Sequence, residues 1–252
     1  MMKSDEHHSM APIGDTRCNC ALPHETLAHT ASWSRRAFLK SSGAGLAGGL
    51  LLGTGASQAR AQTSLSPDAA LHELMAGNRR FIEGRLTSFD EDLAEIKAKT
   101  AEKQEPFAAI LSCADSRVPV ELIFDQSIGR LFVTRVAGNV ATSAIIASLE
   151  YGVAALGTRA LLVVGHANCG AVKAAIEAKA VPGQISTLYP YLRPAVDQAG
   201  PHLEAAIKAN AKIQAALLRE ASPVIAAAVK KKELKVAAGY YDLKSGQVSL
   251  LD

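Results

Sequence analysis

Three short, uninterrupted apolar runs lie in the middle of the chain, at Phe107–Cys113, Leu131–Val136 and Ala160–His166. Runs of this length, bounded by polar residues or Gly, are typical of strands that are buried on both faces, as in a parallel sheet. A further strand is predicted at Leu234–Tyr241, and the segment Lys244-Ser245-Gly246 after it has the composition of a hairpin turn. The pattern therefore predicts a sheet of mainly parallel strands.

Helical periodicity fills most of the intervals between these strands. The first helix begins at Ser66-Pro67-Asp68, a capping residue with Pro in the first turn, and the Pro-rich passage 182–201 has no predicted element. The predicted helices are residues 65–84, 88–103, 139–156, a segment starting at Asn168, 202–220 and 222–232. Strands that alternate with helices predict an α/β fold, in which one mainly parallel central sheet is flanked by helices in a single domain.

The first 61 residues follow a different pattern. The segment Ser34-Arg35-Arg36-Ala37-Phe38-Leu39-Lys40 precedes an uncharged run from Ser41 to Ala59 that is rich in Gly, Ala and Leu. A pair of arginines before such a run is typical of a twin-arginine (Tat) export signal, and Ala59-Arg60-Ala61 provides a signal-peptidase site. We therefore predict a signal peptide at 1–61, a mature domain at 62–252 and a periplasmic location. The alternative is a permanent membrane anchor, which the six glycines of the run disfavour.

Composition agrees with a soluble mature domain of ordinary size. The 252-residue chain has a net charge of +3, and residues 62–252 contain 21 Lys and Arg against 20 Asp and Glu. This balance argues against a nucleic-acid-binding protein. Of the four cysteines, Cys18 and Cys20 belong to the predicted signal, so the mature domain keeps only Cys113 and Cys169.

These two cysteines and one histidine are predicted to meet at one edge of the sheet. Cys113 and His166 end two of the predicted strands, and Cys169 begins the helix after His166. Two thiolates and an imidazole are ligands that zinc prefers, and a catalytic zinc keeps one position open. The position of Cys169 at a helix N-terminus favours its ionisation. Two alternatives remain on ligand count alone: a metal-free core with a buried histidine, and a disulfide.

The segments around these residues resemble a known family. Cys113-Ala114-Asp115-Ser116-Arg117 followed by His166-x-x-Cys169-Gly170 resembles the signature of the β-class carbonic anhydrases. The resemblance extends to Arg135-Val136-Ala137-Gly138-Asn139 and to the Ala-rich helix 144–156, and so covers nearly all of the mature chain. It implies a β-carbonic anhydrase-like fold and a zinc lyase with one Zn²⁺ per chain.

The resemblance also implies roles for individual residues. Cys113, His166 and Cys169 would hold the zinc, and Asp115 paired with Arg117 would be catalytic. Asp115 would accept a hydrogen bond from the zinc-bound water, or become the fourth ligand in a closed state. Gln104 and the backbone amide of Gly170 would bind the substrate.

The activity implied is the reversible hydration of carbon dioxide to bicarbonate and a proton, by attack of zinc-bound hydroxide. One alternative is a zinc hydrolase of carbonyl sulfide or carbon disulfide, and another is a non-catalytic homologue used for bicarbonate binding or assembly. The expected partners are carbon dioxide and bicarbonate, a second copy in a homodimer or dimer of dimers, and the Tat export machinery, with no nucleic acid.

Overall fold

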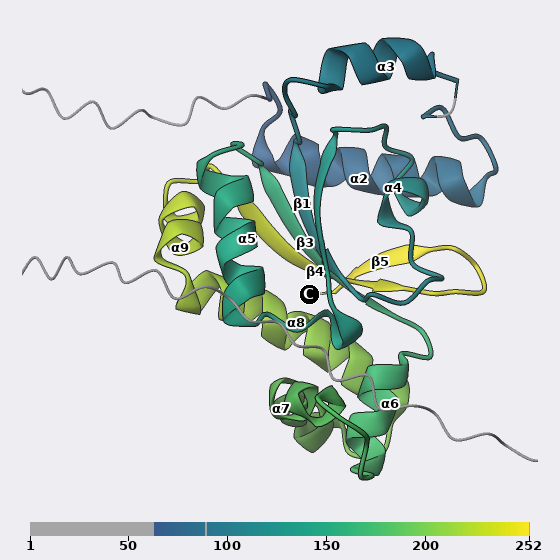
Figure 1. The fold of residues 1–252 in the computed structure, drawn as a ribbon, viewed down its shortest axis with the longest axis vertical. Helices are drawn as coiled ribbons and strands as arrows, with labels where there is room; N and C mark the ends of the chain where they lie inside the picture. Colours follow the sequence, from purple (N-terminus) through teal and green to yellow (C-terminus); the bar gives the residue numbers. More distant parts are fainter. Residues whose placement is uncertain (1–62, 89, 252) are drawn as a thin grey trace, which may run out of the picture. The chain divides into compact units, whose positions relative to one another are not determined.

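The computed structural model describes residues 63–88 and 90–251 of the chain. The predicted signal at 1–61 lies outside these residues. A five-stranded sheet in the order β2-β1-β3-β4-β5 forms the centre of the described part (Figure 1). The strands are β1 (Ala108–Ser112), β2 (Leu131–Arg135), β3 (Ala160–His166), β4 (Lys235–Tyr241) and β5 (Val248–Leu251). All neighbouring strands are parallel except β4 and β5, which are antiparallel.

Burial explains why the central strands are continuously apolar. Every residue of β1 and of β3 is buried, because helices cover both faces of the sheet at these strands. The strand β2 is only partly buried, as expected for a strand at the edge of the sheet. The predicted α/β fold with a mainly parallel sheet is thus confirmed.

Helices lie on both faces of the sheet (Figure 1). One face packs against α2 (Pro67–Ile82) and the short α4 (Val120–Ile123), through an apolar cluster that includes Leu74, Ile110 and Leu162. The other face packs against α5 (Ser143–Ala154), α8 (Leu203–Ala221) and α9 (Pro223–Lys230). The remaining helices are α3 (Leu93–Thr100), α6 (Gly170–Glu177) and α7 (Tyr189–Ala199), with the 3₁₀ segments η1 (Ala137–Asn139) and η2 (Ile185–Leu188).

Local capping sets where several helices begin. The Ser66 hydroxyl accepts a hydrogen bond from Ala69 N–H at 3.2 Å, and Pro67 occupies the first turn of α2. Asp92 caps α3 and Ser222 caps α9 in the same way. Among the described residues, no helix has both the length and the apolar character needed to cross a bilayer.

The structure contains elements that the sequence did not predict, among them η2, α7, α4 and β5. The Pro-rich passage 182–201, which had no predicted element, contains η2 and α7. Pro190 fits the first turn of α7, and buried contacts of Leu192 and Val196 hold the helix although Pro194 lies inside it. The short helix α4 and the antiparallel strand β5 were also not predicted.

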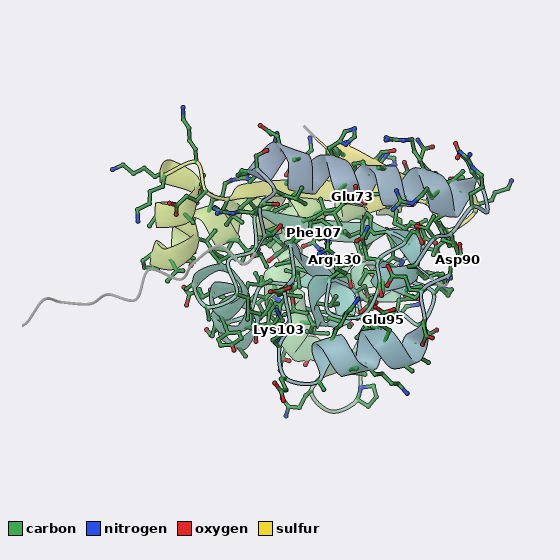
Figure 2. The ribbon with its side chains drawn as sticks, turned by 90° about the horizontal axis from the view of Figure 1, so that it is seen from above. Glu73, Asp90, Glu95, Lys103, Phe107 and Arg130 are labelled. Atoms are coloured by element: carbon green, nitrogen blue, oxygen red, sulfur yellow. The ribbon has the colours of Figure 1, made fainter. Side chains whose placement is uncertain are left out.

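The two ends of the sheet have different chemistry. At the amino ends of β1 and β2, the N–H of Phe107 donates to the carbonyl of Arg130 at 3.1 Å. The Arg130 guanidinium lies 5.1 Å from the centre of the Phe107 ring, and both residues are labelled in Figure 2. The carboxyl ends of β1 and β3 instead carry Cys113 and His166, so the predicted zinc ligands lie at the opposite end of the sheet.

Candidate metal centre

The fold brings Cys113, His166 and Cys169 into one buried cluster. Cys113 directly follows β1, His166 is the last residue of the adjacent parallel strand β3, and Cys169 is the N-cap of α6. Their ligand atoms all lie within 4.8 Å of one another. The three residues are at most 4% exposed. The sequence prediction that these three side chains meet is therefore confirmed.

The imidazole of His166 provides a direct test of whether the cluster fits a metal ion. Its Nδ1 lies 2.9 Å from the carbonyl of Ala167, which fixes Nδ1 as the protonated nitrogen. Its Nε2 is buried and has no hydrogen-bond partner within the described part of the chain. A buried nitrogen lone pair without a donor is unfavourable unless a cation binds it. The donor set of one imidazole and two thiols fits zinc.

The two thiols are free and share their protons unequally. The Cys169 thiol beside Cys113 lowers the pKa of Cys113, and His166 and the amides of Gly138 and Asp115 lower it further, against the effect of burial. The pKa of Cys169 is raised, first by Cys113 and then by burial. The amides at the start of α6 act in the opposite direction but are outweighed. The pair therefore loses one proton readily and the second only when a cation compensates the charge.

Asp115 lies beside the cluster and is held by Arg117. Its Oδ1 accepts hydrogen bonds from the Arg117 amide at 3.0 Å and from Arg117 Nε at 2.9 Å, and its Oδ2 accepts from Arg117 Nη2 at 2.8 Å. The Arg117 guanidinium therefore holds the pKa of Asp115 well below its usual range. Asp115 Oδ2 lies 3.8 Å from His166 Nε2. An ionised carboxylate thus borders the cluster, with its oxygens bonded to Arg117.

Arg135 has a structural role that the sequence did not reveal. Its Nε donates to the carbonyl of Cys113 at 3.0 Å, and its Nη2 donates to the carbonyl of Asp115 at 2.5 Å. The end of β2 therefore holds the backbone of the loop that carries the first thiol and the carboxylate. In the sequence, the one signal for this role is a charged residue, Arg135, at the end of an otherwise apolar strand within the segment Arg135-Val136-Ala137-Gly138-Asn139.

The two predicted substrate-binding residues lie in different places. Gly170 is the first residue of α6, next to Cys169, and a Cβ at this position would meet no atom within 4 Å. Its amide is at a helix N-terminus, where backbone N–H groups lack intrahelical acceptors. Gln104 is exposed and precedes β1, whereas Cys113 follows the other end of that strand. Within one chain, the fold therefore brings Gly170 but not Gln104 to the cluster.

Comparisons with known proteins agree with this geometry. A family model described as carbonic anhydrase matches residues 108–248. Carbonic anhydrase 2 of Mycobacterium tuberculosis is 45% identical over 113 residues, which cover 45% of this chain and 54% of that protein. The carbonic anhydrase of Pseudomonas aeruginosa is 34% identical over 176 residues, which cover 63% of this chain and 79% of that protein. The chain thus spans only about half the length of the mycobacterial relative.

Solved structures show the same fold. The β-carbonic anhydrase CafA of Aspergillus fumigatus has a TM-score of 0.59 and 27% identity, over 63% of this chain and 81% of that chain. The β-carbonic anhydrase CcaA has a TM-score of 0.58 and 26% identity, over 72% of this chain and 95% of that chain. The matched family region contains all three residues of the cluster and the Asp115–Arg117 pair. On the combined strength of the family match, the fold and the cluster, this chain belongs to the β-class carbonic anhydrase family.

Proposed function

We propose that this chain catalyses the zinc-dependent, reversible hydration of carbon dioxide to bicarbonate and a proton. The observation that carries the proposal is the pairing of a three-residue zinc-type cluster with an ionised carboxylate, which lies 3.8 Å from His166 Nε2. A structural zinc site closes its coordination with four protein ligands, whereas a catalytic site has three and an open position. Membership of the family supports the same conclusion.

The residues of this chain have separable tasks in that reaction. Cys113, His166 and Cys169 would hold the zinc, which supplies Lewis acidity and makes a hydroxide nucleophile available near neutral pH when it is bound. Asp115 is an acceptor only, so it would orient the attacking oxygen by taking a hydrogen bond from its O–H group. Arg117 would keep Asp115 ionised and directed away from the metal position. The Gly170 amide would donate to a substrate oxygen.

The overall bond changes are simple. A bond forms between the water oxygen and the carbon of carbon dioxide, while the electron pair of one C=O bond moves to its oxygen and gives bicarbonate. The water proton passes to solvent or buffer. Arg117 is about half exposed, so the Asp115–Arg117 side of the cluster is a route by which the proton can leave. Gln104 stays a prediction, and because it lies at the other end of β1, its contact with substrate would have to come from another copy of the chain.

Stopped-flow measurement of carbon dioxide hydration by the zinc-loaded protein tests the proposal. We expect a rate far above that of buffer, and loss of the rate on removal of zinc. The Asp115→Asn variant should lose turnover while keeping its zinc content. Equal loss of zinc and turnover would point to the non-catalytic alternative. Hydrolysis of carbonyl sulfide or carbon disulfide without carbon dioxide hydration would point to the other substrate class.

We further propose that residues 1–61 are a twin-arginine signal that directs the folded domain 62–252 to the periplasm through the Tat machinery. The support is the Arg35-Arg36 pair before an uncharged apolar run. Because this route transports folded proteins, zinc could bind the thiolates in a reducing compartment before export. Cell fractionation of the variant with Arg35→Lys and Arg36→Lys tests this. Retention in the cytoplasm is expected, and an unchanged periplasmic fraction would refute the route.

We also propose a homodimer, alone or as half of a dimer of dimers. The support is an apolar surface on α5 and the edge strand β2: Ala144 and Ala147 are exposed, Tyr151 is 53% exposed, and the Tyr151 ring lies 6.0 Å from that of Phe132. Small residues on a helix allow close approach of a second copy, and an edge strand leaves backbone groups unpaired. Light scattering of wild type and Tyr151→Glu tests this, with a monomeric variant expected. A wild-type protein that is monomeric at all concentrations would refute it.

A further inference from the structure

The sulfur of Cys113 is connected to helix α8 by a continuous chain of buried hydrogen bonds. The amide of Gly138 donates to Cys113 Sγ at 3.3 Å. The carbonyl of the same Gly138 accepts from Asn210 Nδ2 at 2.8 Å, and Asn210 Oδ1 accepts from Gln214 Nε2 at 3.1 Å. Asn210 and Gln214 are each 1% exposed. Two buried amide side chains are therefore linked to a candidate zinc ligand through Gly138, and among the described residues neither hydrogen-bonds directly to Cys113, His166 or Cys169.

The backbone conformation at Gly138 favours glycine, and the loop around it depends on hydrogen bonds from other elements. Gly138 has φ +78°, in the left-handed region that favours glycine, and a Cβ there would lie 3.1 Å and 3.3 Å from the two methyl carbons of Leu192. The loop lies between the end of β2 and the start of α5, so no regular ladder fixes it. Within the loop, the Asn139 N–H donates to the Val136 carbonyl at 2.9 Å, whereas the Gly138 carbonyl and the Ala141 N–H are bonded to side chains from outside the loop.

Helix α8 supplies that support at two points. The side chain of Asn210 donates to the Gly138 carbonyl, and the side-chain oxygen Oε1 of Gln214 accepts from the backbone N–H of Ala141 at 2.9 Å. The side-chain nitrogen Nε2 of Gln214 also donates to the backbone carbonyl of Tyr191 at 3.1 Å, which connects α7 to the same network. Because Asn210 and Gln214 are four residues apart on one helix, they lie on the same face and hold the loop on both sides of Asn139.

The helix itself is fixed against the strand that carries the histidine ligand. Gly165, the residue before His166, has no side chain where α8 crosses, and a Cβ there would lie 2.9 Å from Ile207 Cγ2 and 3.5 Å from Ala211 Cβ. These two residues flank Asn210 on α8. Close packing of α8 on Gly165 thus sets the position of Asn210 relative to β3. The same helix therefore contacts the strand that carries His166 and holds the loop at Gly138.

We propose that Asn210 and Gln214 are positioning residues for the zinc centre. By fixing the peptide units around Gly138, they direct its N–H at Cys113 Sγ and so orient this ligand atom for the metal. Groups that orient the ligands of a metal are worth about 10- to 100-fold in metal affinity or activity when removed. The inference rests on the proposed function only in that it assumes zinc at this centre, and it does not require hydration of carbon dioxide.

The test measures metal binding rather than turnover. Zinc affinity of the full chain would be determined by competition with a chromophoric chelator, for wild type and Asn210→Ala. The thiolate-to-metal charge-transfer absorption would be recorded after substitution with Co²⁺. We expect Asn210→Ala to lose about 10- to 100-fold in zinc affinity and to show a shifted charge-transfer band. Should Asn210→Ala fail to fold, Gln214→Met, which keeps a similar length, serves as the second variant with the same expected direction.

Asn78 provides a matched control at a distance from the centre. It is also 1% exposed, its Nδ2 donates to the carbonyls of Ile123 and Gly246, and its Oδ1 accepts from Val248 N–H. Asn78→Ala should reduce stability without changing zinc affinity or the cobalt spectrum. Unchanged zinc affinity in both Asn210→Ala and Gln214→Met would overturn the proposal, as would an equal loss in Asn78→Ala. A wild type that binds zinc but does not hydrate carbon dioxide would refute the proposed function and leave this inference standing.

Discussion

Arg117 holds both carboxylate oxygens of Asp115 in a fork of two side-chain hydrogen bonds, with distances of 2.9 Å and 2.8 Å. One residue separates Asp115 from Arg117, and one residue separates Asp115 from the metal-type ligand Cys113. Bidentate guanidinium–carboxylate pairs are strong and directional. The pair therefore sets both the charge of Asp115 and the direction in which its free lone pairs point.

Arg117→Ala should reduce carbon dioxide hydration by about 100-fold or more, because Asp115 would lose the partner that keeps it ionised and oriented. Zinc content should stay near one per chain, since the three ligands are untouched. Stopped-flow rates and metal analysis on the same sample check both statements. Arg193→Ala is the control, because Arg193 forms an exposed ion pair with Asp197 on α7 at 2.7 Å and should leave the rate unchanged. A similar loss in both variants would contradict the assigned role.

Gly138→Ala should weaken zinc binding more than a substitution that causes the same backbone strain away from the zinc cluster. The substitution forces a side chain into a left-handed conformation, at a cost of about 1–2 kcal/mol, and also against the methyl groups of Leu192. Gly183→Ala is the control, because Gly183 has φ +60° but no atom within 4 Å of the added Cβ. Chelator competition and urea unfolding of both variants separate strain from the effect on the centre. Equal zinc affinity in the two variants would be evidence against the described loop geometry.

Removal of zinc should lower the melting temperature in a way that depends on zinc concentration. The empty cluster keeps a buried imidazole nitrogen without a partner and a thiol pair that gives up its second proton with difficulty. A ligand at 100 times its Kd stabilises the folded state by about 2.7 kcal/mol. Thermal unfolding of chelator-treated protein during titration with Zn²⁺ measures this. Mg²⁺ is the control cation, because thiolates do not select it, and an equal response to both ions would exclude a soft-ligand site.

Asp125 should make stability depend on pH on the acid side. Its side chain is fully buried, and although burial raises its pKa, Arg80 and the amide of Ser88 lower it more, so that the pKa of Asp125 lies well below its usual range. A carboxyl whose pKa is lower when folded stabilises the protein above its unfolded pKa of about 3.9 and loses that contribution as pH falls below it. Breaking a buried pair by removing one partner costs about 3–5 kcal/mol.

Urea unfolding of wild type and Asp125→Asn checks this prediction. The difference in the free energy of unfolding should be largest near neutral pH and should shrink as pH falls below about 4. Glu83→Gln is the control, because Glu83 pairs with Arg85 in an exposed position and such pairs contribute little. A difference that does not change with pH would mean that the Asp125 charge has no part in stability.

The zinc cluster could be predicted from sequence because its residues lie at the ends of strongly patterned elements. Apolar runs located β1 and β3, and the carboxyl ends of neighbouring parallel strands necessarily meet at one edge. Ligand chemistry allowed zinc, a metal-free core or a disulfide, and the resemblance to the β-class carbonic anhydrases favoured zinc. The spacing of Asp115 and Arg117, with one residue between them, allowed a local ion pair. Apart from that resemblance, these inferences use only strand ends, ligand chemistry and local spacing, which can be read from the sequence.

The helix α7 shows where sequence reasoning stopped. Pro194 lies inside the helix and disfavours it locally, and the burial of Leu192 and Val196 against the region around Cys113 and Cys169 overrides that preference. The same limit applies to Gln104, whose motif position suggested a substrate contact while the strand β1 separates it from the cluster within one chain.

The sequence by itself determined the α/β pattern, because that pattern depends on local periodicity, and it placed two cysteines and a histidine at one edge of the sheet. The assignment of zinc and the roles of Asp115 and Arg117 came from the resemblance of the surrounding segments to the β-class carbonic anhydrases. Only the tertiary structure decided how these ligands are supported. Arg135 reaches back 22 residues to Cys113, and Asn210 reaches 72 residues to Gly138. Hydrogen bonds over such separations depend on how helices pack on the sheet, and that packing is set by side-chain shape across many elements at once.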